Sequence, residues 1–405
     1  MRGMTTELTI GERIAFYRRR RGLSQEVVAG FVGRTADWLG KIENGRIQLD
    51  RLSVLRRLAE VLDVALGDLI AEPSLLEWTD RSGRATVPAL RSVLMDYRKF
   101  TTTAPLVLDE VPDLDAIRAS VERVWEGYQR SQFGYVTSQL GTLIPQARLA
   151  YEVEEGDRKR LASGRLALAY QVAATTLTKL GEADLAWNAA DRGIEAAQSS
   201  ENPVIIGALL RTVTHSLLAT GAYEEALMVT RDAVGFFQPH LARASRLMLS
   251  VYGAQLLAGS MAAARAENRS VTSDLLHEAD QAARRLGADD NLLWTAFGPT
   301  NVTIHRVSTA MELGDVQVAL AIGPDLDTTS VPTERRVRHA LEVSRALSTR
   351  HRDDAIATVL EAETLAPEQV RYHFISRHLV QTWLRTGRGK PSYQLTGLAK
   401  RLNVA

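Results

Sequence analysis

The sequence predicts an all-α protein with more than one domain, and three observations lead to this expectation. Its 405 residues exceed what one hydrophobic core usually organises. Apolar residues recur at three- and four-residue spacing along most of the chain, with little of the alternation typical of strands. Proline and glycine interrupt this spacing between residues 72 and 112. We therefore predict domains at 1–71 and 113–405, joined by a linker at 72–112 with one short helix near 88–94.

The composition predicts a folded protein of a reducing compartment. Hydrophobic residues make up 45% and charged residues 24%, which excludes a wholly disordered chain. The absence of cysteine excludes disulfides, thiolate nucleophiles and cysteine-ligated zinc. No apolar signal region follows Met1, so we expect a cytoplasmic protein. The uncharged stretch 247–264 is long enough to cross a membrane, but its serine, glycine and glutamine residues predict a buried helix instead.

Positive charge is concentrated near the amino terminus. Between Arg13 and Arg57 there are 11 Lys and Arg residues against 4 Asp and Glu, a net charge of +7. The rest of the chain has 38 basic and 44 acidic residues and nets −6. This asymmetry predicts that the amino-terminal unit meets an anion.

The amino-terminal unit is expected to form five short helices. Ser24 and Thr35 are suited to cap the second and third helices at their amino ends. Gly33 and the pair Asn44-Gly45 supply the turns that end these two helices. The five expected helices cover about 10–21, 24–33, 35–45, 50–62 and 64–70.

The second and third of these helices have the spacing of a helix-turn-helix. A short turn with Gly33 separates them, and the small Ala29 lies where they would cross closely. Val28, Val32, Leu39 and Ile42 would point inward. Together with the following segments, these residues resemble the phage-repressor (Xre) type of DNA-binding domain over about sixty residues: Leu23-Ser24-Gln25-Glu26, Ile42-Glu43-Asn44-Gly45, Leu58-Ala59 and Asp68-Leu69.

The resemblance implies double-stranded DNA as a partner, with the third helix in the major groove and the second across the phosphate backbone. Arginine and lysine suit guanine acceptors, whereas Asp37 would accept only from the cytosine amino group. The arginines at 18–21 have two interpretations, a solvated helix end or a phosphate clamp. A helix-turn-helix used only for protein contacts is the alternative for the whole unit. The implied DNA-binding residues are Gln25, Arg34, Thr35, Ala36, Asp37, Lys41, Asn44 and Arg46.

Small residues recur at matching offsets in the long remainder. Gly181, Gly221 and Gly314 are each followed five residues later by alanine, as is Arg350. Alanine there allows neighbouring helix pairs to stack closely. The segment 219–226 resembles the turn and second helix of a tetratricopeptide (TPR) repeat, although the intervals exceed the usual length of about 34 residues. The resemblance implies a right-handed superhelical, TPR-like α-solenoid of roughly six helix pairs.

The first helix of each pair would line a concave surface. In the regular repeat the inward positions lie ten, six and three residues before the turn glycine. These positions are Arg211, His215 and Leu218 before Gly221, Gln171, Thr175 and Thr178 before Gly181, and Ile304, Ser308 and Met311 before Gly314.

The pair Gly298-Pro299 interrupts a helical tract flanked by aromatic residues and predicts a kink. With side chains of the preceding pair, the kink would line a mostly apolar ligand pocket. The alternative is that these aromatics fill an irregular joint. The candidate ligand-binding residues are Arg211, His215, Tyr252, Gln255, Trp294, Phe297 and Asn301.

The sequence has no motif typical of a catalytic centre. Neither a His-Glu-x-x-His arrangement nor a Gly-x-Ser-x-Gly elbow is present, so we expect no enzyme, metal or cofactor. The layout resembles peptide-sensing quorum regulators and Xre-type pathway regulators. It implies a transcription regulator that forms a homodimer and binds a signalling peptide or small molecule. The alternatives are a protein-binding scaffold tethered to DNA without a small ligand and, third, an enzyme that uses the helical cavity.

Overall fold

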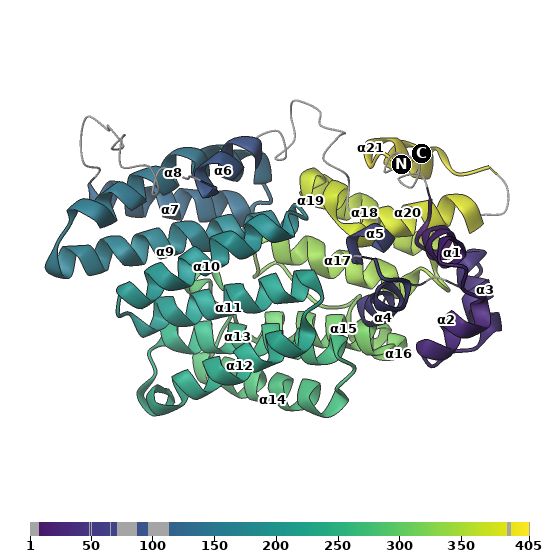
Figure 1. Ribbon diagram of the computed structural model, residues 1–405. Helices are drawn as coiled ribbons and strands as arrows, with labels where there is room; N and C mark the ends of the chain where they lie inside the picture. Colours follow the sequence, from purple (N-terminus) through teal and green to yellow (C-terminus); the bar gives the residue numbers. More distant parts are fainter. Residues whose placement is uncertain are drawn as a thin grey trace.

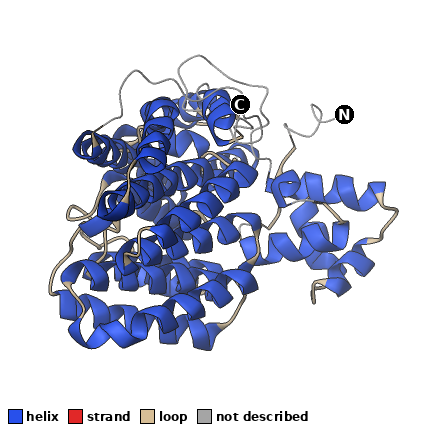
Figure 2. Cartoon of the chain, turned by 60° about the vertical axis from the view of Figure 1, so that its left-hand side comes forward, coloured by secondary structure: helices blue, strands red, loops and turns tan. Residues whose placement is uncertain are grey.

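The computed structural model describes residues 8–47, 49, 51–64, 66–70, 87–95, 113–386 and 390–404. All regular elements in this part of the chain are helices, apart from one isolated bridge between Asp290 and Phe297 (Figure 1). The prediction of an all-α fold is therefore confirmed. The helical amino-terminal lobe projects from a larger body of stacked helices (Figure 2).

The lobe contains the five predicted helices. The Ser24 side chain accepts a hydrogen bond from Val27 N at 3.2 Å, and Thr35 accepts one from Trp38 N at 3.2 Å, so both predicted N-caps are present. One apolar core holds the lobe together. The helices are α1 (Ile10–Arg20), α2 (Gln25–Phe31), α3 (Ala36–Glu43), α4 (Leu52–Leu62) and α5 (Leu66–Ile70).

The predicted linker is described only at α6 (Val87–Leu94), and its remaining prolines and glycine lie outside the described residues. This helix matches the short one expected near 88–94. It packs on helices of the body, and Arg91 forms an ion pair with Glu182 at 3.1 Å. The middle of the predicted linker is therefore part of the body's surface.

Six helix pairs make up most of the body, as predicted. Each first helix packs on its own partner and on the first helices of the neighbouring pairs, which gives the layered arrangement seen in Figure 1. The first helices are α7 (Leu114–Gln129), α9 (Gly156–Lys179), α11 (Pro203–Thr220), α13 (Arg246–Arg265), α15 (Pro299–Leu313) and α17 (Thr333–Leu347). The second helices are α8 (Phe133–Val153), α10 (Ala183–Ser199), α12 (Tyr223–Phe237), α14 (Arg269–Leu286), α16 (Val316–Ile322) and α18 (Arg352–Leu365). The chain continues through α19 (Pro367–Tyr372), α20 (Phe374–Thr386) and α21 (Tyr393–Arg401).

The first five pairs share one turn. After each first helix a residue takes a left-handed conformation, and the next residue donates a backbone hydrogen bond of 2.8–3.0 Å to the carbonyl five residues earlier. Glycine favours this conformation, yet two of the five turns use other residues. The left-handed residues are Ser131, Gly181, Gly221, Glu267 and Gly314.

The stretch before α15 differs from its prediction. Gly298 and Pro299 do not kink a continuous helix; instead, Pro299 is the first residue of α15. The preceding connection is irregular, with positive φ at Leu293, Trp294 and Ala296. Because proline has no backbone N–H and fixes φ, it suits the first turn of a helix better than its middle.

The array curls until its first and last pairs meet. Helix α7 packs against α17, and Ser131 Oγ donates a 2.6 Å hydrogen bond to Gln369 Oε1 of α19. Trp125 of α7 also stacks on Trp294, in the connection before α15, with 5.1 Å between the ring centroids. The first helices therefore surround an interior space.

The uncharged stretch 247–264 is the interior of α13, and 16 of the 20 residues of that helix are buried. Helices α11 and α13 are long and apolar enough to cross a membrane among the described residues, but both belong to the stacked pairs. The prediction of a buried helix at 247–264 is confirmed.

Candidate functional site

A buried ion pair fixes the angle between the helices of the lobe. Arg18 of α1 donates to both carboxylate oxygens of Glu43 on α3, at 2.6 and 2.7 Å. Gln25 of α2 donates to the same carboxylate at 2.7 Å. One acidic side chain at the end of α3 therefore joins three helices, and Gln25 is held in place by it.

The exposed side of α2 and α3 carries most of the predicted DNA-binding residues. Arg34 is exposed and lies over the Trp38 ring, with 5.8 Å from its guanidinium carbon to the ring centroid. Lys41 pairs with Asp37 at 2.6 Å, and both side chains keep solvent contact. Asn44 donates to the Gly40 carbonyl at 2.8 Å. Arg46 is exposed, Ala36 is partly exposed, and Thr35 caps α3 with its hydroxyl.

The basic residues of the lobe divide into two sets. Arg18 is buried against Glu43, and Arg21 is exposed but donates to the Val61 carbonyl at 3.2 Å. The phosphate-clamp interpretation therefore does not apply to Arg18. Arg19, Arg20 and Arg46 are exposed and form no ion pair within the described part of the chain. Much of the amino-terminal positive charge stabilises the fold, and the remainder is displayed to solvent.

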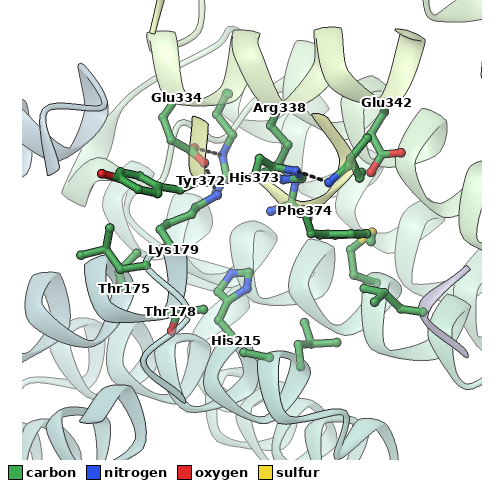
Figure 3. A pocket seen from close by; sticks show the side chains of 18 of the residues that line it. Thr175, Thr178, Lys179, His215, Glu334, Arg338, Glu342, Tyr372, His373 and Phe374 are labelled. Carbon is green, nitrogen blue, oxygen red and sulfur yellow. Dashed lines mark hydrogen bonds and ion pairs between the residues drawn. The ribbon is translucent and has the colours of Figure 1, made fainter. Parts of the chain in front are cut away.

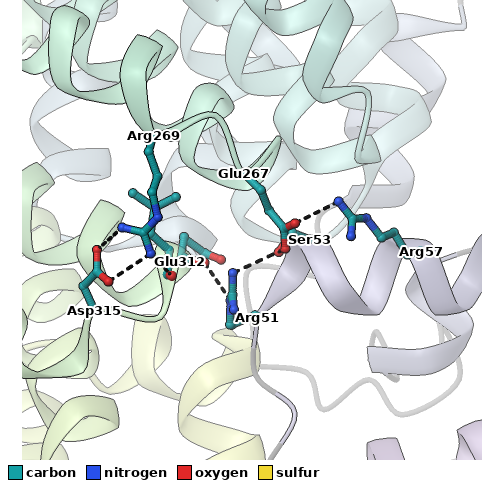
Figure 4. A network of polar contacts seen from close by, with 8 residues as sticks. Arg51, Ser53, Arg57, Glu267, Arg269, Glu312 and Asp315 are labelled. Carbon is teal, nitrogen blue, oxygen red and sulfur yellow. Dashed lines mark hydrogen bonds and ion pairs between the residues drawn. The ribbon is translucent and has the colours of Figure 1, made fainter. Parts of the chain in front are cut away.

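The lobe contacts the body through an ion pair of Glu12 on α1 with Arg385 on α20 at 2.6 Å, and through α4 with the residue before it, as shown in Figure 4. Glu267, the left-handed residue between α13 and α14, accepts from Arg57 at 2.8 Å, Arg51 at 3.3 Å and Ser53 at 3.4 Å. Arg51 also donates to the Glu312 carbonyl at 2.8 Å. Arg56 lies over the Tyr223 ring at 5.0 Å. Helix α4 therefore spans the turns of three successive pairs.

The interior space contains a cavity of about 240 Å³ whose wall comes from both domains. The first helices of all six pairs line it, together with residues of α19 and α20 (Figure 3). Phe374 also packs against the core of the lobe. The lobe contributes Ile10, Arg13, Leu52, Leu66 and Ile70 to the wall.

Charged groups are concentrated in this cavity. Lys179 forms an ion pair with Glu334 from the opposite side of the curl (Figure 3). Burial lowers the pKa of Lys179 to about 8, although Glu334 opposes this shift. Burial alone would raise the pKa of Glu334, but Lys179, Arg335 and Arg338 outweigh it and hold that pKa below its usual value. The pair is therefore ionised at neutral pH.

The concave positions predicted before Gly221 and Gly181 are largely those that line the cavity. Arg211, His215, Leu218, Thr175 and Thr178 are all in its wall. Gln171 is buried and donates to the Ala208 carbonyl at 3.0 Å. On α15 the prediction is wrong by one residue: His305 and Glu312 line the cavity, whereas Ile304, Ser308 and Met311 do not. A different face of this helix is therefore turned toward the cavity.

Of the other candidate ligand residues, only Trp294 lines this cavity. Tyr252 packs edge-on against Phe237 and donates to Glu278. Gln255 donates to Thr214 Oγ1 at 3.0 Å. Phe297 and Asn301 are buried, and Phe297 contacts Gly253 so closely that a Cβ there would lie 1.9 Å from its ring. These four side chains lie in the packing between helices, the arrangement that the irregular-joint alternative describes.

No group of three His, Cys, Asp or Glu residues within the described ranges is arranged to hold a metal ion.

Comparisons with known proteins bear on the lobe. A family model described as a helix-turn-helix domain matches residues 9–72. Among curated proteins none matches. The solved structures that are similar to the chain include two with low identity and a low TM-score. BtubC (BKLC) from P. vanneervenii is 14% identical, with 69% of this chain and 96% of that chain covered and a TM-score of 0.37. Bacillus thuringiensis PlcR, in complex with the peptide PapR7 and DNA, is 13% identical, with 69% and 95% covered and a TM-score of 0.30. Similarity at this level identifies no function for the body, whereas residues 9–72 are a helix-turn-helix DNA-binding domain.

Proposed function

We propose that this protein is a cytoplasmic transcription regulator of the Xre type that binds operator DNA as a homodimer and responds to a ligand in its interior cavity. The observation that carries the proposal is the shared wall of the cavity. Residues of α1, α4 and α5 face the same space as the first helices of the body. A ligand in this space contacts both domains, and its binding energy depends on how they are docked.

Ligand control requires the signal to bind two arrangements of the lobe unequally. The docked arrangement supplies five side chains of the lobe to the cavity, and an undocked lobe supplies none of them. A ligand that uses these side chains favours docking, and one that needs their space favours release. In either case the spacing of two recognition helices in a dimer changes, and with it the affinity for paired half-sites.

The closure of the array favours a small molecule or a short peptide over a folded partner protein. Helix α7 meets α17, so the first helices surround the cavity instead of forming an open trough. A scaffold for folded partners needs an accessible concave surface. The closed array therefore supports the sensor over the scaffold alternative.

The DNA part is tested by selecting genomic fragments on the purified protein and measuring affinity against salt concentration. We expect a retained operator and a linear fall of log affinity with log salt. Replacing Arg34 and Arg46 by alanine should lower the steepness of this line by about 0.9 for each phosphate that the variant no longer neutralises. Arg130→Ala, an exposed arginine of the body, is the matched control. A protein that retains no fragment in dilute buffer would refute the proposal.

The ligand and dimer parts need separate measurements. Native mass spectrometry of protein from its own cells should show a bound compound, and analytical ultracentrifugation should show two protomers. Addition of the identified compound should change operator affinity. Unchanged affinity at saturation would refute the sensor while leaving DNA binding intact.

A further inference from the structure

The cavity carries more positive than negative charge. Seven basic side chains line it against three carboxylates. Lys179 pairs with Glu334, which also lies 3.6 Å from Arg335 of the wall. Glu312 lies 3.6 Å from Arg265 of the wall and 3.8 Å from Arg345, which is not part of the lining, and Glu342 pairs with Arg345 at 3.2 Å. Two arginines of the wall, Arg211 and Arg338, form no ion pair with a carboxylate among the described residues.

Arg211 of α11 is the clearest case. The residue is 5% exposed, and the distance from Arg211 Nη1 to His215 Nε2 is 3.4 Å. Its Nε has no hydrogen-bond partner among the described residues. Burial, followed by the charge of Arg335, lowers the pKa of Arg211 to about 10, so its guanidinium is charged at neutral pH. An uncompensated buried charge costs several kcal/mol, so a fold keeps one where something else pairs with it.

Arg338 of α17 faces the same space (Figure 3). It forms no hydrogen bond or ion pair within the described part of the chain. Burial and the positive charges of Arg211, Arg335 and Arg338 lower the pKa of His215 well below its usual value. His215 is therefore neutral, and these arginines act together on one region of the cavity.

The rest of the wall is apolar and aromatic. Trp294 stacks on Trp125, whose ring is nearly parallel at 6°. Tyr128, Leu218 and Met261 add further apolar surface to the lining. Such a wall suits the hydrocarbon or aromatic body of a small ligand, and the arginines suit an oxyanion.

We propose that the cavity binds an organic anion, with one carboxylate-type group held by Arg211 and Arg338 and an aromatic or aliphatic body against the Trp294 side. This proposal rests on the proposed function and adds the chemical class of the signal. Two sources share this chemistry: a small organic acid and the free carboxyl terminus of a short peptide. The excess of positively charged side chains in the cavity wall favours either of these anions over an uncharged ligand.

The test uses two dyes with the same ring system and the full-length protein. The anionic 1-anilinonaphthalene-8-sulfonate and the neutral N-phenyl-1-naphthylamine differ by one sulfonate group. We expect the anionic dye to bind more tightly. Arg211→Met should weaken the anionic dye about 10- to 100-fold, because a charged hydrogen bond is removed, and change the neutral dye less than about twofold. Arg130→Met should change neither dye.

A stability measurement separates a ligand anchor from a structural arginine. Because Arg211 has no carboxylate partner among the described residues, Arg211→Met should raise the thermal midpoint of the ligand-free protein. A lower midpoint would indicate a structural role and overturn the proposal. Equal affinity for the two dyes would also overturn it, as would an affinity for the anionic dye that does not change in Arg211→Met.

Competition against the bound anionic dye identifies the source. We expect displacement by 3-phenylpropionate, by N-acetyl-Leu-Phe with a free carboxylate, or by both, and none by their amides. Amides that displace the dye as well as the acids, or acids that both fail to displace it, would overturn the proposal. These dye measurements need no DNA. If the dyes show no preference for the anion while a neutral compound still releases the operator, the proposed regulator function is retained and the anion site is refuted. If the protein binds no operator but the dye results are as expected, the anion site is retained and the regulator function is refuted.

Discussion

Replacing Glu267 by glutamine is expected to loosen the docking of the DNA-binding lobe without unfolding either domain. The Glu267 carboxylate accepts from Arg57, Arg51 and Ser53 of the lobe at 2.8, 3.3 and 3.4 Å. The side chains of the two ion pairs are between 25% and 46% exposed, so solvent screens both pairs. We expect the change to weaken docking by about 1 to 2 kcal/mol, a factor of about 5 to 30 in the ratio of released to docked lobe.

The natural absence of cysteine makes the assay direct. Cysteines placed at the exposed positions Glu26 and Glu225 accept spin labels without competition from other thiols. Pulsed electron resonance then gives the distribution of distances between lobe and body. The natural side chain at 267 should give one dominant distance, and Glu267→Gln should add a broad population at longer distances.

Glu201→Gln is the matched control. Glu201 is also a glutamate in the left-handed region between two helices of the body, but its ion pair is with Arg160 of the same domain. Glu267→Gly provides a second variant, since glycine favours the left-handed backbone and removes the carboxylate entirely. Identical distance distributions for Glu267→Gln, Glu267→Gly and Glu201→Gln would refute the reasoning.

Three further predictions concern stability. Glu43→Gln should destabilise the lobe by about 3 to 5 kcal/mol, because it leaves Arg18 buried without its carboxylate; denaturant unfolding followed at Trp38 checks this, and a loss below about 1 kcal/mol would contradict it. Gly253→Ala should cost about 1 to 3 kcal/mol by overpacking against Phe297, and Gly235→Ala, where a Cβ meets nothing within 4 Å, should not. Burial lowers the pKa of His305 to about 3, so below pH 6.5 the unfolded chain binds a proton that the folded chain does not. Stability should then fall by about 1.4 kcal/mol per pH unit between pH 6 and pH 4 from this histidine, and urea titrations of His305→Gln should show a slope reduced by that amount; an unchanged slope would count against it.

The sequence predicted the lobe well because its local signals agree with its packing. Ser24 and Thr35 cap helices in the structure as they do in the pattern, and the inward apolar positions form the core. The use of Arg18 was not predictable, because its partner Glu43 lies 25 residues away on a different helix. A run of arginines has the same local pattern whether its members face solvent or a buried carboxylate.

The repeats were predicted only where glycine marks the turn. Gly181, Gly221 and Gly314 were found, whereas Ser131 and Glu267 take the same left-handed conformation with side chains that do not favour it. At Glu267 the side chain is used to hold the lobe, which accounts for a residue that local propensity disfavours. The cavity depends on the contact between α7 and α17. These helices are far apart in the sequence, so the spacing of apolar residues does not predict their contact.

The meeting of α7 and α17 also sets how this chain folds. In an open array each pair contacts only its neighbours, so it can form progressively as it leaves the ribosome. Here Ser131, which follows the first helix of the first pair, donates its hydrogen bond to Gln369, more than two hundred residues later in the chain. This contact forms only after nearly all of the body has been synthesised. Contacts between residues so far apart in the sequence slow folding. Deleting one internal pair would therefore remove the contact between α7 and α17, and would not simply shorten the array.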